Sequence, residues 1–291
     1  MNTLTLSKRA QIISCLVEGN SILATSRMTN VAKNTITKLL IDVGTACVVY
    51  QDTTLKGLSC KRIQCDEIWV FCYAKEKNVP EEHKGEFGDG DVYTWTAIDA
   101  DTKLVPSFLV GRRDAKYAKI FMDDLASRLT NRVQLTTDGH KAYLEAIEES
   151  FACDIDYAML VKMYGTPSNV ADQHRYSPAG YSGSTKMVIT GKPEEKYIST
   201  SFSERQNLTM RMSVRCFTRL TNAFSKKVEN LECAIALHFM YYNFARVHKT
   251  LRVTPAMEAG ISDHIWTLEE IASLVQIEAP KKRGPYKKRK E

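Results

Sequence analysis

The segment RIQCDEIWVFCY, residues 62–73, constrains the fold of this chain more than any other feature of the sequence. Its β-branched and aromatic residues predict a β-strand. The alternation of side chains along a strand places Asp66 on the same face as Ile68 and Val70, so a carboxylate lies on a mostly apolar face. Burying such a group costs free energy unless something pairs with it. Asp66 is therefore either a buried, paired carboxylate or a ligand, and Glu67, on the other face, is the rival candidate.

The residues that follow predict a mixed α/β sheet. An acidic loop leads from the first strand into a hairpin, and the hairpin is followed by a helix, a short strand and a second helix. The expected strands are 92–99, 104–110 and 133–139, and the expected helices are 114–128 and 140–151. Asp138 stands at the end of the last strand, before Gly139, where an aspartate is commonly only a turn residue. Ligands commonly bind near the ends of central strands. If the strands of Asp66 and Asp138 are adjacent in the sheet, the two carboxylates would lie close together at such a position.

The first fifty residues have the pattern of a helix-turn-helix, in which the second helix of the motif enters the major groove of DNA. In the segment AKNTITKLLIDVG, Ile36 and Leu39 face inward. Polar side chains face outward, where they can contact phosphates and base edges. These candidates are Lys33, Asn34, Thr35, Thr37 and Lys38. The alternative is a three-helix bundle that merely packs against the next domain. Residues 51–61 are expected to be a connector.

Charge is distributed unevenly along the 291 residues. The net charge is +6, yet the last twelve residues alone carry seven Lys or Arg and one Glu. Residues 1–50 and 200–250 are also basic, so the remainder is acidic. Separate basic zones indicate a long polyanion as partner, and the alternative is solvated surface helices and a charged tail. No apolar run approaches about 18 residues, which predicts no membrane span. The absence of a Cys-x-x-Cys pair favours reduced cytoplasmic thiols over a zinc site.

Residues 201–220, SFSERQNLTMRMSVRCFTRL, predict a helix with an unusual charge pattern. Arg211, Arg215 and Arg219 recur every four residues and would stack on one face of that helix. Like charges at this spacing repel each other. Contact with DNA phosphates would relieve the repulsion, which makes the three arginines candidates for DNA binding.

Glu204 lies in the first turn of the same helix, beside Arg205 and Asn207, which are further candidates for DNA contact. An acid at that position favours the helix dipole, which is the simple explanation. If the helix packs across the sheet, however, Glu204 converges with Asp66 and Asp138. Three carboxylates repel one another unless a divalent cation is present. Mg²⁺ prefers carboxylate and water oxygens, and two such ions support in-line phosphoryl transfer.

The motifs CDEIW, TTDG and SERQNLTMR…FTRLTNAFSK resemble those of the DDE transposases of bacterial insertion sequences, particularly the insertion sequence 1 family. The segment MYYNFARVHKTLRVTPAMEAG is also similar to the C-terminal part of many integrase-core transposases. The resemblance implies a ribonuclease H-like, integrase-type core behind the helix-turn-helix, with the acidic triad of the family on Asp66, Asp138 and Glu204. It further implies Mg²⁺-dependent cleavage at transposon ends, with Mn²⁺ as a substitute, followed by attack of the freed 3′-hydroxyl on target DNA.

The expected domain order places a catalytic core after the helix-turn-helix and its connector. The remaining expected segments are a core at 62–260 with a loop-like insertion at about 166–200, a C-terminal helix at 261–279 and a basic tail at 280–291. Within the core, Arg246, His248 and Lys249 are candidates for phosphate contact. Double-stranded DNA is the expected partner, both as transposon ends and as target, and synapsis of two ends calls for a homo-oligomer. The expected location is the cytoplasm, on the nucleoid.

Two other functions stay open on the sequence. The first is a helix-turn-helix repressor whose transposase core is inactive, although the presence of all three acids argues against a decayed core. The second is a ribonuclease H-like endonuclease that cuts DNA without strand transfer. Divalent-metal binding separates the first from a transposase, and a joined DNA product separates the second.

Overall fold

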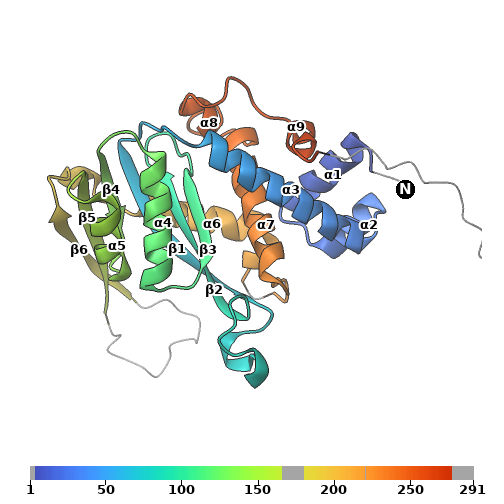
Figure 1. Cartoon of the computed structure of the whole chain (residues 1–291), viewed down its shortest axis with the longest axis horizontal. Coiled ribbons are helices and arrows are strands. Elements are labelled where there is room, and N and C mark those ends of the chain that lie inside the picture. The colour runs from blue at the N-terminus through green and yellow to red at the C-terminus, as the bar shows by residue number, and fades with distance from the viewer. Residues whose placement is uncertain (1–3, 166–179, 220, 277–291) are drawn as a thin grey trace, which may run out of the picture.

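A six-stranded sheet organises the described part of the chain, residues 4–165, 180–219 and 221–276, in the computed structural model (Figure 1). Its strands are β1 (Arg62–Cys72), β2 (Gly90–Asp99), β3 (Ser107–Gly111), β4 (Val133–Thr137), β5 (Ile155–Gly165) and β6 (Gly180–Thr190). They lie in the order β3-β2-β1-β4-β5-β6. The central pairs β1–β4 and β4–β5 are parallel, whereas the pairs toward both edges are antiparallel. The expected mixed α/β sheet is confirmed.

Helices cover both faces of this sheet. The helices nearest to it are α4 (Ala115–Arg128), α5 (Ala142–Phe151), α6 (Ser201–Ser213) and α7 (Val228–Met240). Figure 1 shows α4 and α5 in front of the strands and α6 behind them. The alternation along β1 decides what each face meets. Cys65 belongs to the apolar cluster that contains Phe121 of α4, whereas Ile68 and Val70 belong to the cluster that contains Met210 of α6.

Three helices precede the sheet: α1 (Leu6–Val17), α2 (Ile22–Thr29) and α3 (Lys33–Thr54). The side chains of Thr5 and Ser21 accept hydrogen bonds from the first turns of α1 and α2, which is the usual way to begin a helix. Helix α3 continues past residue 50 into the segment expected to be a connector. It packs along α7, where a Cβ on Gly44 would lie 2.4 Å from the Cβ of Cys233. The glycine therefore permits a close crossing of the two helices.

The N-terminal helices share one apolar core with the sheet. Ile36 and Val43 of α3 belong to the same buried cluster as Trp95 of β2 and Tyr143 of α5. Because burial of apolar area is the main favourable contribution to folding, this shared cluster stabilises the junction between the two parts of the chain. The N-terminal helices therefore do not have a core of their own that is separate from the rest.

The segment after α7 is mostly irregular. A π-helical turn, Tyr241–Ala245, ends α7 and is followed by α8 (Pro255–Glu258) and α9 (Leu268–Ser273). Within the expected C-terminal helix, 261–279, only the short α9 is helical among the described residues, and it packs against α1. The basic tail at 280–291 lies outside the described residues. In the part of the chain that the structure describes, no helix has the length and apolar character needed to cross a membrane.

The expected loop at about 166–200 is wrong for residues 180–190, whereas residues 191–200 are irregular except for a 3₁₀ turn at Glu195–Tyr197. Residues 180–190 form β6, which pairs antiparallel with β5 at one edge of the sheet. Most side chains of β6 are exposed, and the strand contains Gly183 and several hydroxyl residues. Backbone pairing with β5, rather than an apolar face, therefore holds the strand in place, and the sequence carries little of the alternating pattern that identifies strands. Residues 166–179 lie outside the described residues.

The helix expected over 201–220 is also too long. Helix α6 ends at Ser213, Val214 adopts extended dihedral angles, and residues 215–217 form a single 3₁₀ turn. Val214 and Phe217 are buried at 5% and 4% exposure. Burial of these two apolar side chains in the cluster beneath α7 turns the chain away from the helix axis. The three arginines of this segment therefore do not form a stripe along one helix.

Candidate active site

Three carboxylates meet where β1 and β4 lie side by side. Asp66 and Glu67 belong to β1, and Asp138 directly follows β4. Each contributes one oxygen to a group in which all three oxygens lie within 4.8 Å of one another. The parallel register explains the meeting, because it pairs Gln64 with Thr136 and, continued by two residues, sets Asp66 beside Asp138. The hypothesis that central strands would bring these two aspartates together agrees with this register.

Hydrogen bonds hold the carboxylates in place. Asp66 accepts from the backbone N–H of Glu67 and from Nδ2 of Asn207, both at 2.8 Å. Asp138 accepts from the backbone N–H of His140 at 2.9 Å. The guanidinium of Arg113 bridges the other two acids, with its Nε 3.1 Å from Glu67 and its Nη2 3.5 Å from Asp138. Each acid therefore has at least one fixed donor, which restricts its orientation.

The electrostatic environment disfavours the ionised forms of two of these acids. Burial, together with the nearby charges of Glu67 and Asp138, raises the pKa of Asp66 to about 7. Burial and the charge of Asp138 likewise raise the pKa of Glu67 to about 7, although the neighbouring Tyr143 and Arg113 oppose the shift. The Glu67 side chain is only 1% exposed, and its Oε1 has no hydrogen-bond partner among the described residues. Negative charge in this group is therefore incompletely compensated by the protein.

These shifts predict a pH-dependent stability cost in the metal-free protein. Below about pH 4 the carboxyl of Asp66 is protonated in both the folded and the unfolded state. Between its ordinary pKa of 3.8 and its folded pKa of about 7, the unfolded chain releases a proton that the folded chain keeps. The free energy of unfolding therefore falls as the pH rises through this window and levels off above it. The size of the shift, from 3.8 to about 7, corresponds to roughly 4 kcal/mol.

Thermal unfolding in EDTA at pH 5.5 and pH 8 checks this prediction against the variant Asp66→Asn. We expect the Tm of the variant, relative to that of the natural chain, to be higher at pH 8 than at pH 5.5, because the cost of the buried carboxyl continues to grow between these two pH values. Comparison with the variant cancels contributions from other titrating groups. A Tm difference that is the same at both pH values would contradict the prediction.

Glu204 lies near this group but is not a member of it. Helix α6 begins against β1, because the side-chain oxygen of Gln64 accepts from the backbone N–H groups of Phe202 and Ser203 at 2.8 and 3.2 Å. The exposed Glu204 carboxylate pairs with Lys162 of β5 and accepts from the hydroxyl of Thr200 at 2.5 Å. Its charge still contributes to the raised pKa of Asp66. The acid therefore lies at the edge of the carboxylate group, held by contacts of its own.

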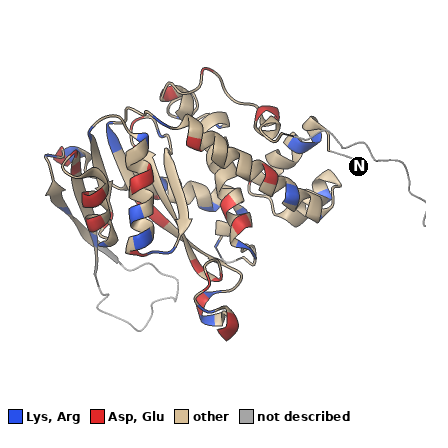
Figure 2. Cartoon of the chain, in the orientation of Figure 1, with Lys and Arg blue, Asp and Glu red and all other residues tan. Residues whose placement is uncertain are grey.

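The sequence-predicted DNA contacts are mostly at the surface. The exposed candidates are Lys33, Asn34, Thr35, Lys38, Arg205, Arg215, Arg219, Arg246 and Lys249, and the half-buried ones are Thr37, Asn207, Arg211 and His248. The hydroxyl of Thr37 donates to the carbonyl of Lys33, and Asn207 donates to Asp66. Figure 2 shows the basic residues spread over several elements, while acidic residues mark the tip of the segment between β1 and β2. The structure therefore assembles no single basic stripe from these candidates.

Sequence reasoning missed three residues that shape the site. Arg113 follows β3 and reaches two of the carboxylates, whereas Lys162 comes from β5 and pairs with Glu204. Gln64 begins α6. The signal for Gln64 was present, because it lies two residues before Asp66 and thus on the same face of β1. No local pattern marks Arg113 or Lys162, since their partners lie far away along the chain.

Two other features lie apart from the carboxylates. A cavity of about 400 Å³ is bounded by the N-terminal helices, the turn after α6 and α7, and the buried His238 lines it. On the segment between β1 and β2, the imidazole of His83 contacts Glu86 and Asp89 at 3.3 and 3.0 Å. In this second group, the imidazole of His83 is itself the partner of both carboxylates. Neither feature contacts Asp66 or Asp138.

The position of the carboxylates, between neighbouring strands of a mixed sheet, is that of a candidate metal-dependent site. Residues 85–166 match a family model described as a DDE domain (DDE_Tnp_IS240). This match supports a DDE transposase, and with it a nuclease or transposase class of enzyme, but does not confirm the insertion sequence 1 family. It includes Arg113 and Asp138, whereas Asp66 precedes it and Glu204 follows it.

The chain also has similarity to two solved transposase structures. It is similar to the Mos1 transposase paired-end complex with left transposon end, at 11% identity and a TM-score of 0.24 over 54% of this chain and 60% of that one. It is also similar to the piggyBac transposase synaptic complex with hairpin DNA, at 10% identity and a TM-score of 0.36 over 93% of this chain and 70% of that one. The chain thus spans 60% of the Mos1 protein that it matches. No curated protein matches the sequence.

Proposed function

We propose that this protein is a DNA transposase of the DDE class, which cleaves strands at transposon ends and transfers the freed 3′-hydroxyl to target DNA. The observation that carries the proposal is the group of three carboxylates at β1 and β4, whose oxygens lie within 4.8 Å of one another. Residues 85–166 of the same chain match a DDE domain. The catalytic core is ribonuclease H-like, of the integrase type. Its active form is a homo-oligomer in the cytoplasm, on the nucleoid, because two DNA ends must be held together.

The residues present fit a divalent cation. Three carboxylates whose oxygens converge, two of them with strongly raised pKa values, form an acceptor set that a hard cation satisfies better than protons do. We assign Asp66 and Asp138 of this group as two ligands of Mg²⁺, with Mn²⁺ as a substitute, and we propose that the exposed Glu204, rather than the buried Glu67, is the third. When bound as a pair, such ions activate an attacking hydroxyl and stabilise the leaving oxygen of a phosphoryl transfer.

The surrounding side chains orient these acids. Asn207 fixes one oxygen of Asp66, and the backbone N–H of His140 fixes one oxygen of Asp138. Gln64 holds the first turn of α6 against β1, which keeps Glu204 beside the other acids. Arg113 supplies positive charge to Glu67 and Asp138. Donors that preset the geometry lower the reorganisation needed during the reaction.

DNA binding rests on the N-terminal helices and on scattered basic residues. We propose that α1 to α3 form a helix-turn-helix and that α3 presents the polar side chains at its N-terminal end to the major groove. Arg205, Arg215, Arg219 and Lys249 are exposed and free to approach phosphates. Double-stranded DNA, as transposon ends and as target, is the proposed partner.

A plasmid nicking assay tests the proposal. The protein is incubated with Mg²⁺ and a supercoiled plasmid that carries the DNA flanking its own gene, beside the variant Asp138→Asn. We expect nicks at inverted repeats with the natural chain, at least about a hundredfold fewer with the variant, and joined products on longer incubation. The control without metal is EDTA, in which cleavage stops.

Each other outcome overturns part of the proposal. Specific DNA binding without nicking in either Mg²⁺ or Mn²⁺ would identify a helix-turn-helix repressor with an inactive core. Nicking at the same ends without any joined product would identify an endonuclease that lacks strand transfer. Equal nicking by Asp138→Asn would remove that residue from the metal ligands.

A further inference from the structure

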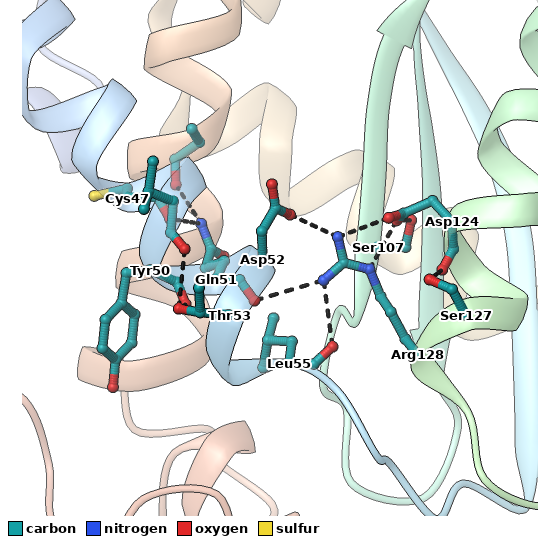
Figure 3. Close-up of polar contacts among 12 residues, drawn as sticks. Cys47, Tyr50, Gln51, Asp52, Thr53, Leu55, Ser107, Asp124, Ser127 and Arg128 are labelled. Carbon is teal, nitrogen blue, oxygen red and sulfur yellow. Dashed lines mark hydrogen bonds and ion pairs between the residues drawn. The ribbon is translucent and has the colours of Figure 1, made fainter.

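A buried arginine joins the N-terminal helices to the sheet, apart from the carboxylates. Arg128 ends α4 and is 6% exposed. Its Nε and Nη2 donate to Asp124 at 2.7 and 2.9 Å, and Nη2 also donates to Asp52 at 2.6 Å (Figure 3). Its Nη1 donates to the carbonyl oxygens of Gln51 and Leu55 at 3.5 and 3.3 Å. A guanidinium has five N–H donors, and these contacts use all of them.

The contacts of Arg128 join the end of α3 to α4 and, through Asp124, to β3. Asp52 and the carbonyl of Gln51 belong to the last turn of α3, where the negative end of the helix dipole favours a cation. Asp124 belongs to α4, and it also accepts from the hydroxyl of Ser107 at the start of β3 at 2.6 Å. Arg128 therefore fastens the C-terminal end of α3 to the edge of the sheet.

Helix α3 connects the proposed DNA-binding end to this junction without a break. Its 22 residues span about 33 Å, and the polar candidates from Lys33 to Lys38 lie at the opposite end from Asp52. Near its middle and end it contacts α7, where Gly44 crosses Cys233 and the side chain of Gln51 donates to the carbonyl of Ala236 at 3.2 Å. The N-terminal half of α3 packs on α1 and α2, and apolar side chains further along it belong to the cluster shared with the sheet. Arg128 adds the ion pair that ties the last turn of α3 to α4.

We infer that Arg128 is a positioning residue that sets the separation between the DNA-contacting end of α3 and the carboxylate group. The inference rests on the proposed function, because the separation between α3 and the carboxylate group matters only if α3 binds the DNA that the carboxylate group cleaves. If α3 holds the recognised sequence, a fixed α3 brings one phosphodiester, at a constant number of nucleotides from that sequence, to Asp66 and Asp138. A small displacement at the reacting atoms is enough to change which bond is cut, since phosphoryl transfer depends on alignment.

Mapping of cleavage positions tests the role of Arg128. End-labelled DNA nicked by the full chain is resolved at single-nucleotide level for Arg128→Gln, Arg128→Lys and the control Arg132→Gln. Arg132 makes surface ion pairs with Asp156, so its variant removes the same charge without touching α3. We expect Arg128→Gln to raise the share of nicks outside the principal position at least about fivefold, Arg128→Lys to restore part of the precision, and the control to match the natural chain.

A distance measurement tests the same inference without DNA. Nitroxide labels are placed on the exposed native Cys153 and on Lys38→Cys, with Cys15 and Cys216 changed to serine, and the distance distribution is recorded by pulsed electron resonance. We expect Arg128→Gln to broaden the distribution about twofold, because the ion pair no longer ties the last turn of α3 to α4. If Arg128→Gln does not fold, Asp52→Asn takes its place in both measurements, since Asp52 is half-exposed and its loss leaves no buried charge without a partner acid.

The two measurements separate the inference from the proposed function. A natural distance distribution in the folded variant, or nicks confined to the principal position whatever their rate, would overturn the role of Arg128. Failure of the natural chain to nick DNA, together with a broadened distribution in the variant, would overturn the proposed function and leave Arg128 as the residue that positions α3.

Discussion

Replacement of Asp66 by asparagine is expected to lower the rate of DNA strand cleavage by roughly a thousandfold or more. Asparagine has the shape of aspartate, and its side-chain oxygen can still accept from Asn207, but it lacks the negative charge that a cation requires. The charges of Glu67, Asp138 and Glu204 all contribute to the raised pKa of Asp66, so this carboxyl lies near each of the other three acids. Loss of this ligand therefore removes more than a peripheral contact.

The measurement combines cleavage with DNA binding and stability. Single-turnover nicking is compared among the natural chain, Asp66→Asn and the matched control Asp91→Asn, which alters an exposed carboxylate on the neighbouring strand β2. Affinity for the same DNA should stay within about threefold, because Asp66 faces the metal ligands rather than the proposed DNA-binding end of α3. Natural cleavage by Asp66→Asn, or an equal loss in the control, would contradict the assignment of Asp66 as a ligand.

Much of the sheet is predictable from the sequence because its central strands have an apolar face. The alternation in 62–73 and the apolar run in 92–99 locate β1 and β2 within a few residues. The third strand begins later than expected, at Ser107. Pro106 has no N–H to donate, and the carbonyl of Leu104 accepts from Asp99 in the turn, so the residues before Ser107 belong to the turn.

The edge of the sheet formed by β5 and β6 is not predictable in the same way. Their pairing joins backbone groups, and the side chains of β6 are largely exposed, so no hydrophobic pattern records the strand. For helix α6 the local sequence predicts more regular structure than the protein forms, whereas for β6 it predicts less. The residues of the α6 segment favour a helix as far as residue 220, but the burial of Val214 and Phe217 ends it at Ser213. Tertiary packing decided both outcomes, and local sequence does not contain that information.

In the candidate site, too, some residues are predictable from the local sequence and others are not. The sequence identifies Asp66 because a carboxylate on an apolar face needs a partner. It identifies Asp138 because this residue stands at the end of a short central strand. The parallel register of β1 and β4 then sets them side by side. The partners that orient or neutralise them, such as Arg113 and Lys162, come from distant segments. A single sequence identifies residues whose environment is unfavourable without a ligand, but it does not identify what the fold supplies to them.

The identity of the third acid gives the last prediction, because two glutamates compete for the role. Glu67 already lies within 4.8 Å of both aspartates, whereas Glu204 pairs with Lys162 at the edge of the group. Glu67, however, points to the face of β1 covered by α4 and α5, and Arg113 neutralises it there. Glu204 is exposed, on the same side as the Asn207 that contacts Asp66. An acid that must hold a hydrated ion within reach of DNA phosphates needs that accessibility.

We therefore expect Glu204→Gln to lower Mg²⁺-dependent nicking roughly a hundredfold or more, and Glu67→Gln to lower it about tenfold or less. Single-turnover rates at saturating Mg²⁺ give the comparison, and both variants keep the shape of the side chain. Calorimetric titration with Mg²⁺ separates the causes, since loss of a ligand weakens binding of the ion, whereas loss of an orienting neighbour mainly slows cleavage. If the two effects are reversed, the group of Asp66, Glu67 and Asp138 is itself the complete metal site. The pairing of Glu204 with Lys162 would then serve only to fix α6 against β5.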